Sequence, residues 1–249
     1  MSAGPSPRAA PPGPRRACVF GTSGGIGGAF ARQLAREGWT VHAGSRSGGG
    51  ERLSAMIPFR FDLTEEASIA EAARTTGADG PLDMVFVATG LLHGQGFGPE
   101  KSWSMIDPEA MRQVLAVNTI GPALIAKHFL PLLARQRPSV FAVLGARVGS
   151  IADNRLGGWH SYRASKAALA MLVKDFAIEL ARRNSAAIAV ALHPGTVDTR
   201  LSEPFQGSVP EGKLFTPEFS AARLREVIDG LRREHSGQHL AWDGSLIPA

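Results

Sequence analysis

The sequence ACVFGTSGGIG, residues 17–27, places a short apolar run directly before a glycine-rich turn. A helical pattern follows over residues 28–37 and ends at Gly38, a residue typical of helix C-termini. Such a turn lets the backbone approach a pyrophosphate at the helix N-terminus, here through Gly21, Gly25 and Gly27. The spacing is Gly-x-x-x-Gly-x-Gly, which a tight strand-to-helix connection could also produce. The strand before it and the helix after it favour a dinucleotide-binding turn.

Strand-like and helical segments alternate from this turn to the C-terminus. The predicted further strands are 40–44, 56–61, 82–88, 139–144, 186–192 and 238–242. The predicted further helices are 65–74, 108–117, 120–134, 159–182 and 217–234, with an interruption near Asn118. This alternation predicts parallel βαβ units, and continuous apolar strands are typical of a sheet covered on both faces. We therefore predict an α/β fold: a doubly wound parallel sheet (Rossmann fold) in three layers, forming a single domain over residues 17–249.

Residues 1–16 are rich in proline, alanine and arginine and too poor in apolar residues to fold. We expect a disordered tail without the apolar core of a signal peptide, and hence a cytoplasmic protein. The chain's net charge of +5 is concentrated in this tail. The remainder shows no basic stripe with interleaved aromatics, so we expect no nucleic-acid partner. An RNA-binding role for the basic tail is the alternative.

Other features exclude several classes of protein. The single cysteine, Cys18, rules out an intramolecular disulfide framework, and its place in an apolar strand indicates a core residue. The seven histidines are scattered, so we expect no metal site. We expect no apolar run that is long enough to span a bilayer.

Tyr162 and Lys166 lie four residues apart in a predicted helix, so both heads can reach one reacting centre. A free tyrosine has a pKa of about 10. A nearby cation favours the phenolate and lowers that pKa, which makes the hydroxyl a usable acid or base. This spacing alone arises often by chance.

The end of the second strand, AGSRS at residues 43–47, has no acidic residue to bind a ribose 2′-hydroxyl. Ser45 and Arg46 could instead hold a 2′-phosphate. The sequence therefore favours NADP(H) over NAD(H) as cofactor, although Arg46 could also be a solvated loop residue.

These motifs, in this order, resemble the classical short-chain dehydrogenase/reductase family from Ala17 to the C-terminus. The glycine loop matches Thr-Gly-x-x-x-Gly-Ile-Gly, except that Phe20 replaces the threonine. In this resemblance Asn118 supports a catalytic water chain, and Tyr162 and Lys166 are the catalytic pair. The positions matched to cofactor contacts are Gly21, Ser23, Gly25, Ile26, Gly27, Asp62, Leu63, Ala88, Gly90, Pro194, Gly195, Val197 and Thr199. Residues 149–162 and 241–244 look closest to members called C-factor-like or carbonyl-reductase-like.

The resemblance implies interconversion of a carbonyl and an alcohol with NADP(H). Hydride would move between the nicotinamide and the substrate carbon, and Tyr162 would act as general acid or base. Lys166 would lower the pKa of Tyr162 and hold the nicotinamide ribose. The alternative is a C-factor-like signalling or interaction protein that binds NADP(H) with weak or no catalysis. The family forms monomers and oligomers, so a homo-oligomer is possible.

One departure from the family concerns the serine that binds the substrate oxygen. It normally precedes a glycine by three residues, and that position here is Ala146. Either Ser150, beyond Gly149, replaces it as the catalytic hydroxyl, or the site lacks this donor. Losing such a donor costs about a hundredfold to a thousandfold in turnover.

Residues 91–97 and 201–215 follow strand ends, where they would close a substrate pocket. We expect an apolar carbonyl or alcohol substrate because aromatic and aliphatic side chains cluster there. His160 and Ser161, beside Tyr162, are predicted to lie at the surface or in a lid. The expected apolar lining is Leu91, Leu92, Phe97, Trp103, Trp159, Leu201 and Phe205.

Overall fold

The computed structural model describes residues 14–49 and 53–249, and a seven-stranded parallel sheet forms its centre. The strand order is β3-β2-β1-β4-β5-β6-β9, as a doubly wound fold requires. The fold class predicted from the sequence is thereby confirmed. The strands are β1 Arg16–Phe20, β2 Thr40–Ser45, β3 Met56–Arg60, β4 Met84–Val87, β5 Ser139–Leu144, β6 Ala187–His193 and β9 His239–Ala241.

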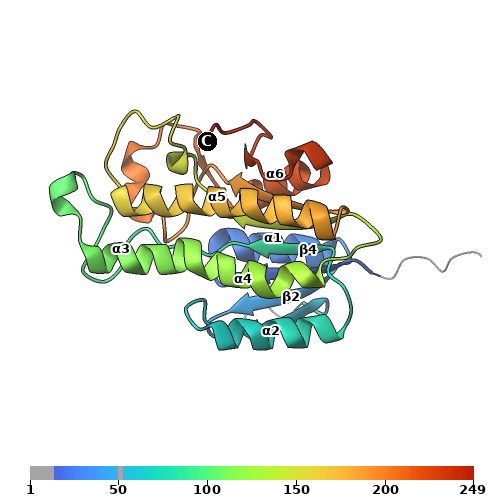
Figure 1. Ribbon diagram of the computed structural model, residues 1–249. Coiled ribbons are helices and arrows are strands. Elements are labelled where there is room, and N and C mark those ends of the chain that lie inside the picture. The colour runs from blue at the N-terminus through green and yellow to red at the C-terminus, as the bar shows by residue number, and fades with distance from the viewer. Residues whose placement is uncertain (1–13, 50–52) are drawn as a thin grey trace, which may run out of the picture.

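Helices cover both faces of the sheet. Helix α1 (Gly25–Arg36) packs beside α6 (Pro217–Asp229) on one face. On the other face α4 (Gly121–Phe129) lies between α2 (Glu66–Ala78) and α5 (His160–Arg183), as Figure 1 shows. Helix α3 (Pro108–Leu115) runs almost directly into α4 and also contacts α5.

Alternate side chains of β1 enter two separate cores. Cys18 and Phe20 join the core under α2, α4 and α5, whereas Ala17 and Val19 join the core under α1 and α6. All four are fully buried, which explains why the strand is apolar at consecutive positions. Burial also raises the pKa of the Cys18 thiol, in keeping with its predicted place in the core.

Strand β1 pairs with β2 on one side and β4 on the other, so the chain turns in opposite directions from this point. In open α/β sheets, the crevice at the carboxyl ends of such strands is where ligands bind. The glycine-rich turn leaves β1 at that edge. The strand order alone therefore predicts a ligand site at this edge of the sheet, next to the glycine-rich turn.

Several boundaries differ from the prediction. Arg16, assigned to the tail, opens β1: its backbone N–H donates to Asp83 Oδ2 at 2.8 Å, and its guanidinium donates to Thr76 O at 2.9 Å. Residues 1–13 of the predicted tail lie outside the described residues. Helix α6 ends at Asp229 and is capped by Gly230, whereas the predicted helix ran to residue 234. A two-stranded sheet, β7 (Thr196–Val197) with β8 (Leu214–Phe215), was not predicted.

The interruption predicted near Asn118 is a π-helical turn at Ala116–Ile120, between α3 and α4. Together with its neighbours it forms the stretch Pro108–Leu132, which is long and apolar enough to cross a membrane by length and composition. The expectation that no run has this property was therefore wrong. In the structure this stretch is partly buried against α2 and α5, as a core helix is.

Candidate active site

The glycine loop is built so that side chains are excluded where the backbone must pass closely. Gly21 has φ +87°, and a Cβ there would lie 2.9 Å from Ala88 O. A Cβ on Gly27 would meet the carbonyl oxygen of Gly21. Gly24, the residue before α1, provides no side-chain cap, so the first N–H groups of α1 remain open to an anion. This arrangement fits a bound pyrophosphate.

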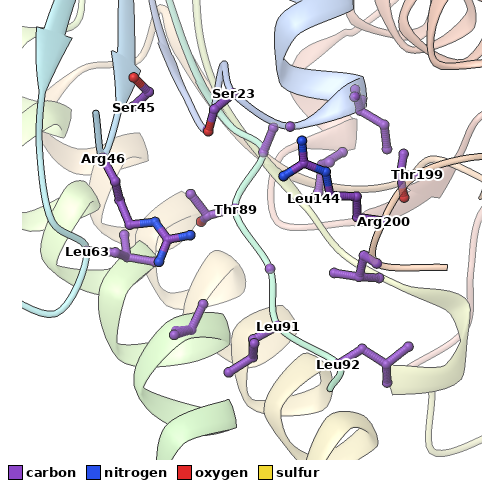
Figure 2. A pocket seen from close by; sticks show the side chains of 18 of the residues that line it. Ser23, Ser45, Arg46, Leu63, Thr89, Leu91, Leu92, Leu144, Thr199 and Arg200 are labelled. Atoms are coloured by element: carbon purple, nitrogen blue, oxygen red, sulfur yellow. The ribbon is translucent and has the colours of Figure 1, made fainter. Parts of the chain in front are cut away.

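A cavity of about 580 Å³ runs along the carboxyl edge of the sheet, from Arg46 to Tyr162. Figure 2 shows its lining from β2, the glycine loop, the segment after β4 and the segment at Thr199–Arg200. Most of the predicted cofactor contacts line it: Gly21, Ser23, Gly25, Ile26, Ser45, Arg46, Asp62, Leu63, Ala88, Gly90, Tyr162, Lys166, Pro194 and Thr199.

Five predicted site residues are not part of this lining. Gly195 has φ +80°, and a Cβ there would contact the Phe215 ring at 2.6 Å. Val197 is buried and pairs with Phe215 in the small sheet. Gly27, Asn118 and Ser150 are buried. Sequence reasoning also missed several lining residues: Gly24, Phe61, Thr64, Thr89, His93, Val117, Leu144, Gly145 and Arg200.

The 2′-phosphate candidates Ser45 and Arg46 lie at one end of the cavity, and Figure 2 shows the Arg46 side chain extending into it. The nearby carboxylate, Asp62, accepts hydrogen bonds from Thr64 N at 2.9 Å and Thr64 Oγ1 at 2.7 Å. These bonds lower the pKa of Asp62, chiefly through the hydroxyl, with the Arg46 charge as a smaller cause. The Asp62 carboxylate is therefore already hydrogen-bonded within its own turn.

Tyr162 and Lys166 come from the first two turns of α5 and lie at the other end of the cavity. Lys166 Nζ donates to Leu144 O at 2.7 Å and lies 5.8 Å from the centre of the Tyr162 ring. Burial raises the pKa of Tyr162 to about 12 and lowers the pKa of Lys166 to about 8. The sequence prediction that the cation lowers the pKa of this tyrosine omitted desolvation, which dominates in the protein alone.

Asn118 is fully buried in the π-helical turn, and its amide is used by protein groups. Nδ2 donates to Leu91 O at 2.8 Å and Ser165 Oγ at 3.0 Å, while Oδ1 accepts from Leu91 N at 2.7 Å. Ser165 Oγ in turn donates to Tyr162 O at 2.7 Å. Asn118 thereby ties the segment after β4 to the backbone of the helix that carries Tyr162.

Ala146 occupies the position of the family's serine, and it packs with Leu92 and Tyr162. Ser150 is 3% exposed, and its Oγ accepts a hydrogen bond from Asp153 N at 3.0 Å. The hydroxyl thus closes a local turn instead of lining the cavity. Its assignment as a catalytic donor stays a prediction that its position does not favour.

A histidine pair lies beside Lys166. A Cβ on Gly145 would be 2.5 Å from His239 Nε2, so the imidazole occupies the space a side chain would need. Neither His239 Nε2 nor His193 Nδ1 has a hydrogen-bond partner in the described part of the chain. Burial lowers the pKa of both imidazoles to about 4; the charge of Lys166 lowers that of His239 further, and the charge of His239 lowers that of His193.

The N-terminus of α5 is held by a buried carboxylate. Glu100 is 5% exposed, its carboxylate accepts from Ser161 N at 3.2 Å and from Ser161 Oγ, and Glu100 O accepts from Trp159 N at 2.5 Å. Ser161 is therefore a buried structural residue and not the surface or lid residue expected. Trp159 has φ +51°, which is rare for a bulky side chain.

The end of the cavity near Tyr162 is lined by apolar side chains. Leu91, Leu92 and Leu201 line it, as predicted. Trp159 lies edge-on to Tyr162, with ring centres 6.2 Å apart, and 5.2 Å from the ring of Phe205. Trp103, also predicted to line the cavity, is instead 81% exposed in a short 3₁₀ helix.

Comparison with known proteins places this site in a family. A model of the short chain dehydrogenases matches residues 15–208. The chain belongs to the short-chain dehydrogenase/reductase family. The 1-hydroxy-2-glutathionyl-2-methyl-3-butene dehydrogenase of Rhodococcus sp. is 33% identical over 92% of this chain and 97% of its own length.

Two further relatives represent the subgroup that the sequence suggested. The C-signal protein of Myxococcus xanthus is 32% identical, over 71% of this short-chain dehydrogenase/reductase and 98% of its own length. The NADPH-bound carbonyl reductase from chicken fatty liver superposes with a TM-score of 0.82 at 26% identity, covering 95% of this chain and 94% of that one. The recognised family and its carbonyl-reductase-like character are confirmed.

Proposed function

We propose that this short-chain dehydrogenase/reductase is an NADP(H)-dependent oxidoreductase that interconverts an apolar carbonyl compound and its alcohol. The observation that carries the proposal is that one cavity holds the glycine loop, Arg46 and the Tyr162–Lys166 pair. A dinucleotide extended along it would run from its 2′-phosphate at Arg46 to its nicotinamide near Tyr162. The NADPH-bound relative supports this choice of cofactor.

When bound, the nicotinamide cofactor supplies hydride to the substrate carbon or accepts it. Tyr162 would donate its phenol proton to the carbonyl oxygen during reduction. Its pKa of about 12 keeps that proton in place at neutral pH until the oxygen becomes basic. Lys166 would bind the nicotinamide ribose through its ammonium, after releasing Leu144 O. The alcohol product leaves with the tyrosine proton, which solvent must replace.

The experiment is NADPH oxidation, followed by absorbance, with a panel of aldehydes and ketones. Tyr162→Phe should abolish turnover while leaving NADPH binding intact, because the phenyl ring keeps the packing with Trp159. Arg46→Ala should weaken NADPH binding and leave NADH binding unchanged. Turnover by Tyr162→Phe at the wild-type rate would refute the acid–base role.

A second candidate function is dinucleotide-dependent signalling or interaction with little catalysis. Ala146, in place of the serine, favours it, as does the similarity to the C-signal protein. It predicts NADP(H) binding by calorimetry without turnover on any carbonyl. Turnover that collapses in Tyr162→Phe would exclude it.

A further inference from the structure

Arg200 lines the cavity, although no motif in the sequence indicated it. Its backbone is fixed on both sides: Ser202 N donates to Thr199 O at 3.0 Å, and Arg200 O lies 3.2 Å from His93 Nε2. Its side chain is exposed and makes no hydrogen bond or ion pair with any described residue. The Arg200 backbone is thus held in place while its guanidinium has no partner among the described residues, so the guanidinium is available for a ligand.

Figure 2 shows where that guanidinium points. Arg46 enters the cavity from β2, and Arg200 enters from the opposite wall, so that the two head groups face the same space. The backbone of Arg200 also lies beside the glycine loop. A Cβ on Gly25 would be 2.8 Å from Cγ2 of the preceding residue, Thr199. Arg200 thus starts next to the open N-terminus of α1.

The charges of the cavity match a ligand with more than one anionic group. Within the described part of the chain, its charged lining side chains are Arg46, Lys166, Arg200 and one carboxylate, Asp62. Asp62 is bonded to Thr64, as described above, and the proposed cofactor assigns Arg46 to the 2′-phosphate and Lys166 to the ribose. Arg200 remains, next to the loop where the diphosphate would lie.

We propose that Arg200 binds the diphosphate of the dinucleotide and thereby fastens the segment 199–205 over the cavity. This inference rests on the proposed function. The segment also carries Leu201, which lines the substrate end, and Phe205, which packs on Trp159. A diphosphate held by Arg200 therefore connects the cofactor to the wall against which the substrate lies.

Two ligand fragments separate this role from that of Arg46. ADP-ribose contains the diphosphate without a 2′-phosphate, whereas 2′-AMP contains the 2′-phosphate without a diphosphate. Calorimetry at fixed ionic strength should show that Arg200→Ala weakens ADP-ribose by about ten- to a hundredfold, the range for a lost charge-assisted hydrogen bond, and leaves 2′-AMP unchanged. Arg46→Ala should do the reverse, and Arg200→Lys should retain part of the ADP-ribose affinity.

The matched control is Lys213→Ala, which removes an exposed cation from the same loop outside the cavity and should change neither affinity. ADP-ribose should also slow amide hydrogen exchange over residues 199–205 in the wild type and the control, but not in Arg200→Ala. Unchanged ADP-ribose affinity in Arg200→Ala overturns the inference. A variant that keeps this affinity and only raises the KM of carboxylate-bearing substrates would show that Arg200 binds the substrate instead. A wild type that binds neither fragment overturns the proposed function as well.

Discussion

The carboxylate of Glu100 caps helix α5, accepting from the backbone N–H of Ser161 at 3.2 Å one residue before Tyr162. Within the described residues no lysine, arginine or histidine forms an ion pair with it. Its buried charge is therefore balanced by hydrogen bonds and by the positive N-terminus of α5. This cap holds the first turn of α5, from which Tyr162 lines the cavity.

Glu100→Gln removes that charge while keeping the side-chain shape. We expect a loss of about 1–2 kcal/mol in the free energy of unfolding, the range for a charged group at a partly buried helix terminus. If Tyr162 is the proposed acid, kcat should also fall more than KM rises, because its hydroxyl loses its alignment. Urea unfolding and steady-state kinetics measure both. Glu71→Gln, at an exposed site on α2, is the control and should change neither.

Ala146→Ser should restore the missing hydrogen-bond donor. If the proposed reduction is correct, kcat should rise by about ten- to a hundredfold, because a donor aimed at the developing oxyanion acts mainly in the transition state. Ser150→Ala is the matched test of the competing assignment and should leave kcat within about twofold. A hundredfold loss in Ser150→Ala would instead identify Ser150 as the donor.

The histidine pair should make the protein sensitive to acid. The folded-state pKa of His239 and of His193 is lowered from 6.5 to about 4. Between pH 4 and 6.5 the unfolded chain therefore binds more protons than the folded protein. The free energy of unfolding falls as the pH falls through this range. Each histidine contributes a loss of about 3 kcal/mol, at 1.36 kcal/mol per pKa unit. Thermal unfolding at several pH values should show a smaller loss in His239→Gln; an unchanged pH dependence would contradict the prediction.

Gly27→Ala tests the close packing of the glycine loop. The new methyl group would meet Gly21 O, so the turn must shift. We expect a loss of about 1–3 kcal/mol in the free energy of unfolding, the range for overpacking, together with weaker NADPH binding. Gly98→Ala is the control because a Cβ there meets nothing within 4 Å. Equal NADPH affinity in the two variants would show that the loop tolerates the shift.

The sequence was sufficient to predict the sheet and most of the cavity wall formed by the ends of its strands. Strand β1 is apolar at consecutive positions because both of its faces are buried, and Gly21 marks its end. Parallel pairing then brings the residues after β2 and β4 to the same edge as the glycine loop. Local patterns and one topological rule predict this part of the cavity.

The remaining site residues depend on contacts between distant parts of the chain. Glu100 and Ser161 are 61 residues apart, and the loop that carries Glu100 has no periodic pattern. Trp103 was predicted to line the cavity for its residue type, but the chain turns it to solvent. The pKa of Tyr162 depends on burial, which spacing to Lys166 does not reveal.

Gly145 and His239 share one space in the structure. The His239 imidazole lies where a side chain on residue 145 would lie. A side chain at position 145 would meet the tip of the His239 imidazole, so that ring must shift or residue 239 must change. The end of β5 and the last strand of the sheet should therefore have changed together. In relatives with a larger residue at 145 we expect a different residue at 239, so the two positions should covary although they lie 94 positions apart.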